Sequence, residues 1–270
     1  MSKEKYMIER KEGGSTGLGK LDYLFNKTTQ DFLLRSGLKT GLHVLDIGCG
    51  SGVMSQWIAK QVGSTGHVVG IENDLNQLNA AKKLASDLNI SNVTFELGSA
   101  YELDKLNQKF DLVYCRFVLH HLHDPTKAIA QIYSALKDQG FYVAEEGIVN
   151  FAFSYPNSSA WGNEYTRLPP PWTDLPVDNR DPNIGIKMIT KMKQAGFDIQ
   201  EYQIIHPLMV TKEEKQYLML GIDEFKEFYL SEGHSIDEWE AFVKATEDIV
   251  NDDNQIAGFY GSFQVSGRKA

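Results

Sequence analysis

The feature that most constrains this chain is the segment VLDIGCGSG, Val44 to Gly52. An apolar run ends in Asp46, and Gly48, Gly50 and Gly52 follow before a pattern typical of a helix. Glycine permits positive φ and lets a ligand lie against the main chain, while the first turn of a helix has unpaired N–H groups. The segment therefore predicts a strand, a turn and a helix that together bind a nucleotide.

Two details indicate which nucleotide is bound. A dinucleotide fingerprint needs a third glycine three residues after the second, where this chain has Val53. Asp46 would repel a pyrophosphate, but it would attract a ligand that has an ammonium group and a sulfonium. The chemistry favours S-adenosylmethionine. VLDIGCGSG also resembles motif I of the class I S-adenosylmethionine-dependent methyltransferases.

The end of the next predicted strand fits this family, and the end of the strand after it departs from the family pattern. VVGIE ends in Glu72, at the place where a carboxylate accepts both ribose hydroxyls. VTFELGSA has Ser99 where relatives usually have an aspartate that receives the adenine amino group. Serine accepts a hydrogen bond but has no charge, so adenine recognition is expected to rest more on the backbone of Ala100 and Tyr101.

FDLVYCRFVLHHL, Phe110 to Leu122, resembles motif IV and the loop that follows it. In relatives this loop lies against the methionine part of the cofactor, and His121 is the histidine expected to face it. The spacing of His120, His121 and His123 does not place two metal ligands on one helix face, so no metal is expected. The cofactor site that the resemblance implies consists of Asp46, Gly48, Cys49, Gly50, Ser51, Gly52, Glu72, Asn73, Ser99, Ala100, Tyr101, Cys115, Arg116, Phe117 and His121.

Strand and helix patterns alternate as far as Glu146, which predicts an α/β fold with a mostly parallel sheet and helices on both faces. The resemblance implies a Rossmann-like sheet of seven strands in the order 3-2-1-4-5-7-6. We expect a single domain over residues 1–270, with an N-terminal helical cap at 1–38. The expected strands cover 43–47, 67–71, 93–97, 111–115 and 140–146, and the expected helices cover 52–62, 75–88 and 125–138.

Two segments are expected to cover the methyl acceptor. Residues 148–183 form a lid-like insertion that contains six of the eight prolines together with Phe151, Tyr155, Trp161 and Trp172. A long stretch without periodicity is often a binding loop, and its aromatic side chains provide apolar walls; a structural wrap over the sheet edge is the alternative. A helical insertion at 208–255 forms the second part. Its apolar stripes could pack in the core or form the interface of a homodimer.

The composition of the chain disfavours some classes of binding partner. A net charge of −9 disfavours binding to nucleic acid, which requires a basic surface. The sequence has no apolar run near the length of a membrane span, and its start lacks the apolar region of a signal peptide, so a cytoplasmic protein that does not bind membranes is expected. The two cysteines, Cys49 and Cys115, give neither a disulfide framework nor a metal spacing.

The resemblance implies in-line transfer of a methyl group to an oxygen, nitrogen or carbon of a small molecule, with S-adenosylhomocysteine as the product. A general base is required only when the acceptor must lose a proton. Among the candidates are His120, His121, Glu146 and Tyr155, and the sequence does not choose between them. A non-catalytic S-adenosylmethionine sensor is the alternative. A protein methyltransferase and a dinucleotide-dependent oxidoreductase rank lower.

Overall fold

The protein is described by a computed structural model over residues 16–156, 180–219, 222–231 and 233–270. Its contacts divide the chain into two compact units. The large-sheet unit consists of Thr28–Glu146, Ile184–Gln203 and Phe263–Ala270. The small-sheet unit consists of Met1–Lys27, Gly147–Asn183 and Ile204–Ser262, so its ranges include both segments that were expected to cover the acceptor.

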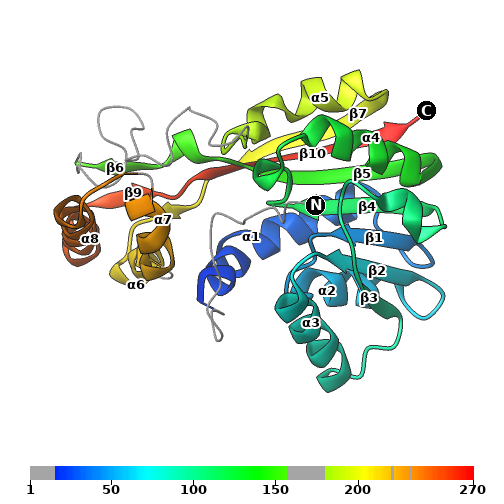
Figure 1. The fold of residues 1–270 in the computed structure, drawn as a ribbon, viewed down its shortest axis with the longest axis horizontal. Coiled ribbons are helices and arrows are strands. Elements are labelled where there is room, and N and C mark those ends of the chain that lie inside the picture. The colour runs from blue at the N-terminus through cyan, green and yellow to red at the C-terminus, as the bar shows by residue number, and fades with distance from the viewer. Residues whose placement is uncertain (1–15, 157–179, 220–221, 232) are drawn as a thin grey trace. The chain divides into compact units, whose positions relative to one another are not determined.

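The large sheet has seven strands in the order β3-β2-β1-β4-β5-β10-β7. Because β7 and β10 are the sixth and seventh strands of this sheet along the chain, the order is the expected 3-2-1-4-5-7-6, which is confirmed. The pairings from β3 to β5 are all parallel (Figure 1). The strands are β1 (His43–Ile47), β2 (His67–Glu72), β3 (Val93–Leu97), β4 (Phe110–Arg116), β5 (Leu136–Ile148), β7 (Phe197–Ile205) and β10 (Gly261–Lys269).

Both faces of this sheet are covered by apolar helix surfaces, which is why its central strands are apolar almost throughout. One face packs Val44 and Leu112 against helices α1, α2 and α3. The other packs Leu45 and Val113 against α4 and α5. The alternation follows from the two-residue period of a strand. These helices are α1 (Thr16–Arg35), α2 (Val53–Val62), α3 (Leu75–Asp87), α4 (Pro125–Ala135) and α5 (Met188–Gln194).

The helices that follow strand ends begin at local signals in the sequence. Asp74 caps α3 by accepting a hydrogen bond from the backbone N–H of Gln77, and Asp124 caps α4 by accepting one from Lys127. Helix α2 begins at Val53, directly after the glycine turn, and its N-cap residue Gly52 provides no side-chain cap. The N–H groups of its first turn therefore lie at the carboxyl edge of the sheet, where ligands bind in folds of this type.

Two adjoining boundaries differ most from those expected. The helix expected over 125–138 ends at Ala135, and the strand expected over 140–146 begins at Leu136. The reason is a register shift in the pairing of β4 with β5, which lets Leu136 pair with Phe110 before the regular ladder begins at Leu112. Such an irregularity depends on the neighbouring strand and leaves no clear periodicity in the sequence.

The small-sheet unit has its own three-stranded sheet, in the order β6-β9-β8, which the sequence analysis did not foresee. Its pairings are antiparallel. The strands are β6 (Phe153–Tyr155), β8 (Leu208–Met209) and β9 (Ile256–Gly258), and the helices are α6 (Lys212–Lys215), α7 (Lys226–Ser231) and α8 (Ile236–Asn251). Residues 157–179, with Trp161 and Trp172, and residues 1–15 lie outside the described residues.

A buried lysine orders the end of α8 in this unit. The Lys215 ammonium donates hydrogen bonds to the backbone oxygens of Asp252 and Gln255, at 2.5 and 3.0 Å. A cation at the carboxyl end of a helix is stabilised by the helix dipole. Trp239, from the same helix, packs with Ile222 and Tyr229 in a small apolar cluster.

Over the residues that the structure describes, no helix is long and apolar enough to cross a membrane.

We expect Asp111 to contribute to stability in a pH-dependent way. Its carboxylate accepts hydrogen bonds from the His43 backbone N–H and the Lys137 ammonium, at 2.8 and 2.9 Å. Burial alone would raise the pKa of this carboxyl, but these hydrogen bonds hold it below its ordinary value of 3.8. An acid with a lowered pKa stabilises the fold above its ordinary pKa, and this contribution is lost as the pH falls through the lowered value.

Asp111→Asn should therefore lower the free energy of unfolding by about 1 kcal/mol at neutral pH. Urea unfolding of both proteins over a pH series measures the difference. It should shrink as the pH falls below about 4. A difference that stays constant down to acidic pH would contradict this account.

Candidate functional site

The glycine turn between β1 and α2 is held to the neighbouring strand by backbone hydrogen bonds. The N–H groups of Gly48 and Cys49 both donate to the carbonyl oxygen of Ile71, at 2.8 and 3.0 Å. Gly48, Gly50 and Gly52 have φ values of 65°, 54° and 78°, a region that residues with a side chain rarely adopt. The sequence pattern of the turn therefore reflects its backbone conformation.

The three glycines differ in what surrounds them. A Cβ at Gly48 would lie 2.6 Å from Val118 Cγ2, and one at Gly52 would lie 2.9 Å from Ala81 and Phe95. At Gly50 no heavy atom lies within 4 Å of that position. Gly48 and Gly52 are thus needed for close packing, whereas Gly50 faces open space in which a ligand can approach the main chain.

Asp46 lies at the end of β1, beside this turn, and its carboxylate is almost fully buried. It accepts a hydrogen bond from the Ser55 hydroxyl at 2.5 Å. Burial raises the pKa of Asp46 to about 7, although the Ser55 hydrogen bond and the charge of Arg116 act in the opposite direction. A carboxyl that titrates near neutral pH in a partly dry site responds strongly to a cation placed beside it.

Glu72 lies at the end of β2 and binds the glycine turn directly. Its Oε2 accepts a hydrogen bond from the Gly50 N–H at 2.9 Å. Its Oε1 accepts hydrogen bonds from the N–H groups of Asn73 and Asp74, at 2.9 and 3.1 Å. Each carboxylate oxygen can accept more than one hydrogen bond, so a ligand with hydroxyl groups can still be bound by Glu72.

The end of β3 has less charge. The Ser99 hydroxyl accepts a hydrogen bond from the Tyr101 N–H at 3.3 Å, and Ala100 is buried. Two leucines that the sequence analysis did not single out are exposed near the acid of β2. Leu97 is 64% exposed and pairs in register with Glu72, and Leu75 is 58% exposed at the start of α3. In the sequence, the signal for this exposed surface was an apolar residue at the end of a predicted strand.

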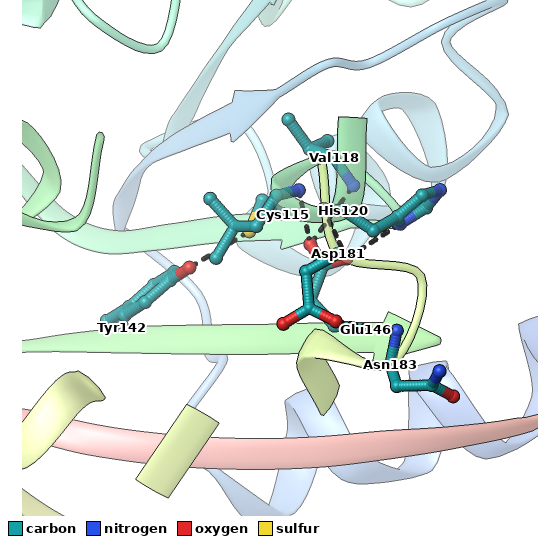
Figure 2. Close-up of polar contacts among 8 residues, drawn as sticks. Cys115, Val118, His120, Tyr142, Glu146, Asp181 and Asn183 are labelled. Atoms are coloured by element: carbon teal, nitrogen blue, oxygen red, sulfur yellow. Dashed lines mark hydrogen bonds and ion pairs between the residues drawn. The ribbon is translucent and has the colours of Figure 1, made fainter. Parts of the chain in front are cut away.

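At the end of β4, Cys115 and Arg116 have different surroundings. The Cys115 thiol is fully buried in the apolar core and lies 3.0 Å from the Tyr142 hydroxyl (Figure 2). Because the thiol is buried, only the backbone of Cys115 could make the contact that was expected with the cofactor. Arg116 Nη1 lies 3.5 Å from the Thr29 hydroxyl, which in turn donates a hydrogen bond to Glu145. Thr29 and Ser55 are polar partners that the sequence analysis missed.

The loop after β4 is held by Glu146, at the carboxyl end of β5. Glu146 Oε1 accepts hydrogen bonds from the backbone N–H groups of Val118 and Leu119, at 3.0 and 2.7 Å. Its Oε2 lies 2.9 Å from His120 Nδ1 (Figure 2). Phe117, just before these residues, has a φ of 55°. Such strain persists only where the surroundings impose it, and here the buried carboxylate orders the loop.

The candidates for a general base thus have different surroundings. Glu146 is fully buried and binds the loop, so it anchors the structure, and its neighbour Glu145 binds Thr29. His120 and His121 lie in the loop, and their ring centroids are 3.9 Å apart. Tyr155 belongs to the small-sheet unit and is 67% exposed on β6. Within the described ranges, no group of three His, Cys, Asp or Glu side chains could hold a metal ion.

Known proteins are similar to the part of the chain that contains this site. A family model described as a methyltransferase domain matches residues 38–172, half of the chain. A demethylmenaquinone methyltransferase of Oceanobacillus iheyensis is 31% identical over 117 residues, which are 43% of this chain and 49% of that protein. The chain thus spans about half the length of this relative.

Solved structures share the fold. A putative methyltransferase of Bacillus halodurans C-125 has a TM-score of 0.58 at 18% identity, over 90% of this chain and 99% of that one. Phosphoethanolamine N-methyltransferase 2 of Haemonchus contortus, solved with phosphomonomethylethanolamine and S-adenosylhomocysteine, has a TM-score of 0.57 at 20% identity. That match covers 96% of this chain and 58% of that one. At these identities the two structures establish the fold alone.

The different surroundings of the glycines predict different costs of substitution. Gly50→Ala adds only backbone strain, so it should lower the free energy of unfolding by about 1–2 kcal/mol. Gly48→Ala adds the same strain and a clash with Val118, whose loop Glu146 holds in place, so its cost should be about 3 kcal/mol or more.

Urea unfolding of both variants measures these costs. Gly41→Ala is the matched control, because Gly41 also has a positive φ and its Cβ would meet only Thr65, at 3.6 Å. Equal losses for Gly48→Ala and Gly41→Ala would show that the loop does not press on the turn.

Proposed function

The chain belongs to the methyltransferase domain family, S-adenosylmethionine-dependent enzymes of class I fold, and on this premise we propose that it transfers a methyl group to a small molecule. The observation that carries the proposal is the open space at Gly50, beside the buried carboxylates of Asp46 and Glu72. An ammonium group, a sulfonium and ribose hydroxyls are complementary to these carboxylates. The similarity to a demethylmenaquinone methyltransferase supports a small acceptor.

In this proposal the ends of β1, β2, β3 and β4 each hold one part of the methyl donor. Asp46 attracts the cationic methionine part, and Glu72 with Asn73 binds the ribose. Ser99, Ala100 and Tyr101 bind the adenine, and the exposed Leu75 and Leu97 offer it apolar surface. The turn residues Gly48–Gly52 lie along the donor, and Arg116, Phe117, His121 and the backbone of Cys115 lie near its methionine part.

The donor supplies an activated methyl group when bound, so the protein's task is to align the acceptor with it and to exclude water. The glycine turn and the loop after β4 provide fixed backbone on two strands of one sheet edge, and Glu72 and Glu146 hold them there. We propose that the insertion at residues 148–183, which is rich in aromatic side chains, recognises the acceptor. Its composition supports an apolar or aromatic binding surface.

Binding of the donor should depend on the ionisation of Asp46. A cation bound beside this group favours its charged form, and because the pKa of Asp46 is about 7, the proton must be displaced at lower pH. The affinity for S-adenosylmethionine should therefore fall about tenfold from pH 8 to pH 6. Calorimetry at both pH values measures the change.

Asp46→Asn is the control, because it keeps an acceptor for the Ser55 hydroxyl but has no charge. It should bind the donor weakly and equally at the two pH values. If the wild-type affinity does not change with pH, Asp46 does not bind the cationic part of the donor.

Two measurements test the function itself. Calorimetry with S-adenosylmethionine, S-adenosylhomocysteine and NAD should detect binding of the first two, and binding of NAD alone would contradict the donor site. A screen of cell metabolite extracts with methyl-labelled S-adenosylmethionine should then yield a labelled small molecule, and Asp46→Ala should not form it. Binding without any labelled product would indicate a sensor, and labelled polypeptide would indicate a protein methyltransferase.

A further inference from the structure

Glu146 binds a histidine side chain as well as the backbone of a loop. Its Oε1 accepts the N–H groups of Val118 and Leu119, and its Oε2 lies 2.9 Å from His120 Nδ1 and 3.4 Å from the His120 backbone nitrogen (Figure 2). All of these groups belong to the large-sheet unit. The same carboxylate therefore fixes where the loop runs and how the His120 ring is oriented.

The chemistry of this contact sets the position of the His120 proton. An ionised carboxylate has no hydrogen to donate, so the nitrogen that faces Glu146 must be the protonated one. Neutral His120 is therefore the Nδ1–H tautomer, and its Nε2 has a free lone pair. Across the described ranges, Nε2 has no hydrogen-bond partner, and the side chain is 15% exposed. The ring thus presents a basic nitrogen from a fixed position.

His120 is distinguished from its neighbours by this contact. The Phe117 ring meets the His120 ring edge-on at 6.1 Å, and the His121 ring lies 3.9 Å from it, so both limit its rotation. His123 is exposed at the end of the loop. The loop itself lies against the proposed donor site, because Val118 fills the space at Gly48. His120 is therefore near the sheet edge where methyl transfer is proposed.

We propose that His120 accepts the proton of the methyl acceptor and that Glu146 is the positioning residue that sets its tautomer. The inference rests on the proposed function and adds a substrate class: the acceptor is a nucleophile that has a proton on the methylated atom, a hydroxyl, phenol or amine group. The bond from sulfur to the methyl carbon breaks as the bond from the acceptor atom to that carbon forms. The acceptor's proton passes to His120 Nε2 and then to water, and S-adenosylhomocysteine leaves.

The tautomer can be measured without knowing the acceptor. In ¹⁵N NMR spectra of histidine-labelled protein, His120 should show a protonated Nδ1 and an unprotonated Nε2, the reverse of the tautomer that free imidazole side chains prefer. His120→Gln identifies the signal by its loss. In Glu146→Gln, an uncharged variant of similar shape, the Nδ1–H preference should disappear. A wild-type His120 protonated at Nε2, or a tautomer unchanged in Glu146→Gln, would overturn the role of Glu146.

Kinetics with the acceptor found in the extract screen test the role of His120. His120→Gln should lower kcat about 100-fold or more, as expected for a lost general base, while the affinity for S-adenosylhomocysteine stays at the wild-type value. Glu146→Gln should lower kcat by a smaller factor. His43→Gln, at the amino end of β1, is the matched control and should keep the wild-type rate.

The outcomes separate this inference from the proposed function. An acceptor labelled equally fast by the wild type and by His120→Gln would leave methyl transfer standing and overturn the role of His120. An acceptor that has no proton on the methylated atom would also leave methyl transfer standing and overturn the role of His120. Absence of any labelled acceptor would contradict the proposed function, while the NMR result would still decide whether Glu146 sets the tautomer.

Discussion

Buried carboxylates at strand ends, each bound to backbone N–H groups of a neighbouring loop, are the interaction on which the site depends. Glu72, on β2, binds the N–H of Gly50 in the turn after β1. Glu146, on β5, binds the N–H groups of Val118 and Leu119 in the loop after β4. In both cases a loop at the end of one strand is held by an acid on the adjacent strand. Hydrogen bonds to a charged acceptor are strong, and burial keeps water from competing for them.

The two anchored segments meet through apolar contact. Val118 packs so closely on Gly48 that a methyl group there would overlap with it. Gly48 therefore has no room for a side chain while the loop after β4 stays in place. Asp46 lies near the end of β1, just before the glycine turn, and burial raises its pKa to about 7. Anchoring acids and an acid that responds to a ligand thus share one sheet edge.

The sequence was informative where a local pattern dictates structure. The glycine turn and the acids at the ends of β1 and β2 followed from motifs. The sheet order was implied by the family resemblance, and the structure confirms it. The end of α4 at Ala135 depends on how β5 pairs with β4, and the small sheet joins segments far apart in the chain. The roles of Glu145 and Glu146 could not be told apart, because their partners Thr29 and Val118 are distant in sequence.

A crystal structure with S-adenosylhomocysteine bound would show directly whether these carboxylates form the donor site. We predict that the ligand lies over Gly50, with its ribose hydroxyls bound to Glu72 and its ammonium group nearest to Asp46. The Glu72 hydrogen bond to the Gly50 N–H and the Glu146 hydrogen bonds to the loop should persist. A ligand bound elsewhere, or a glycine turn rearranged to admit it, would contradict the claim that these carboxylates build the donor site in advance.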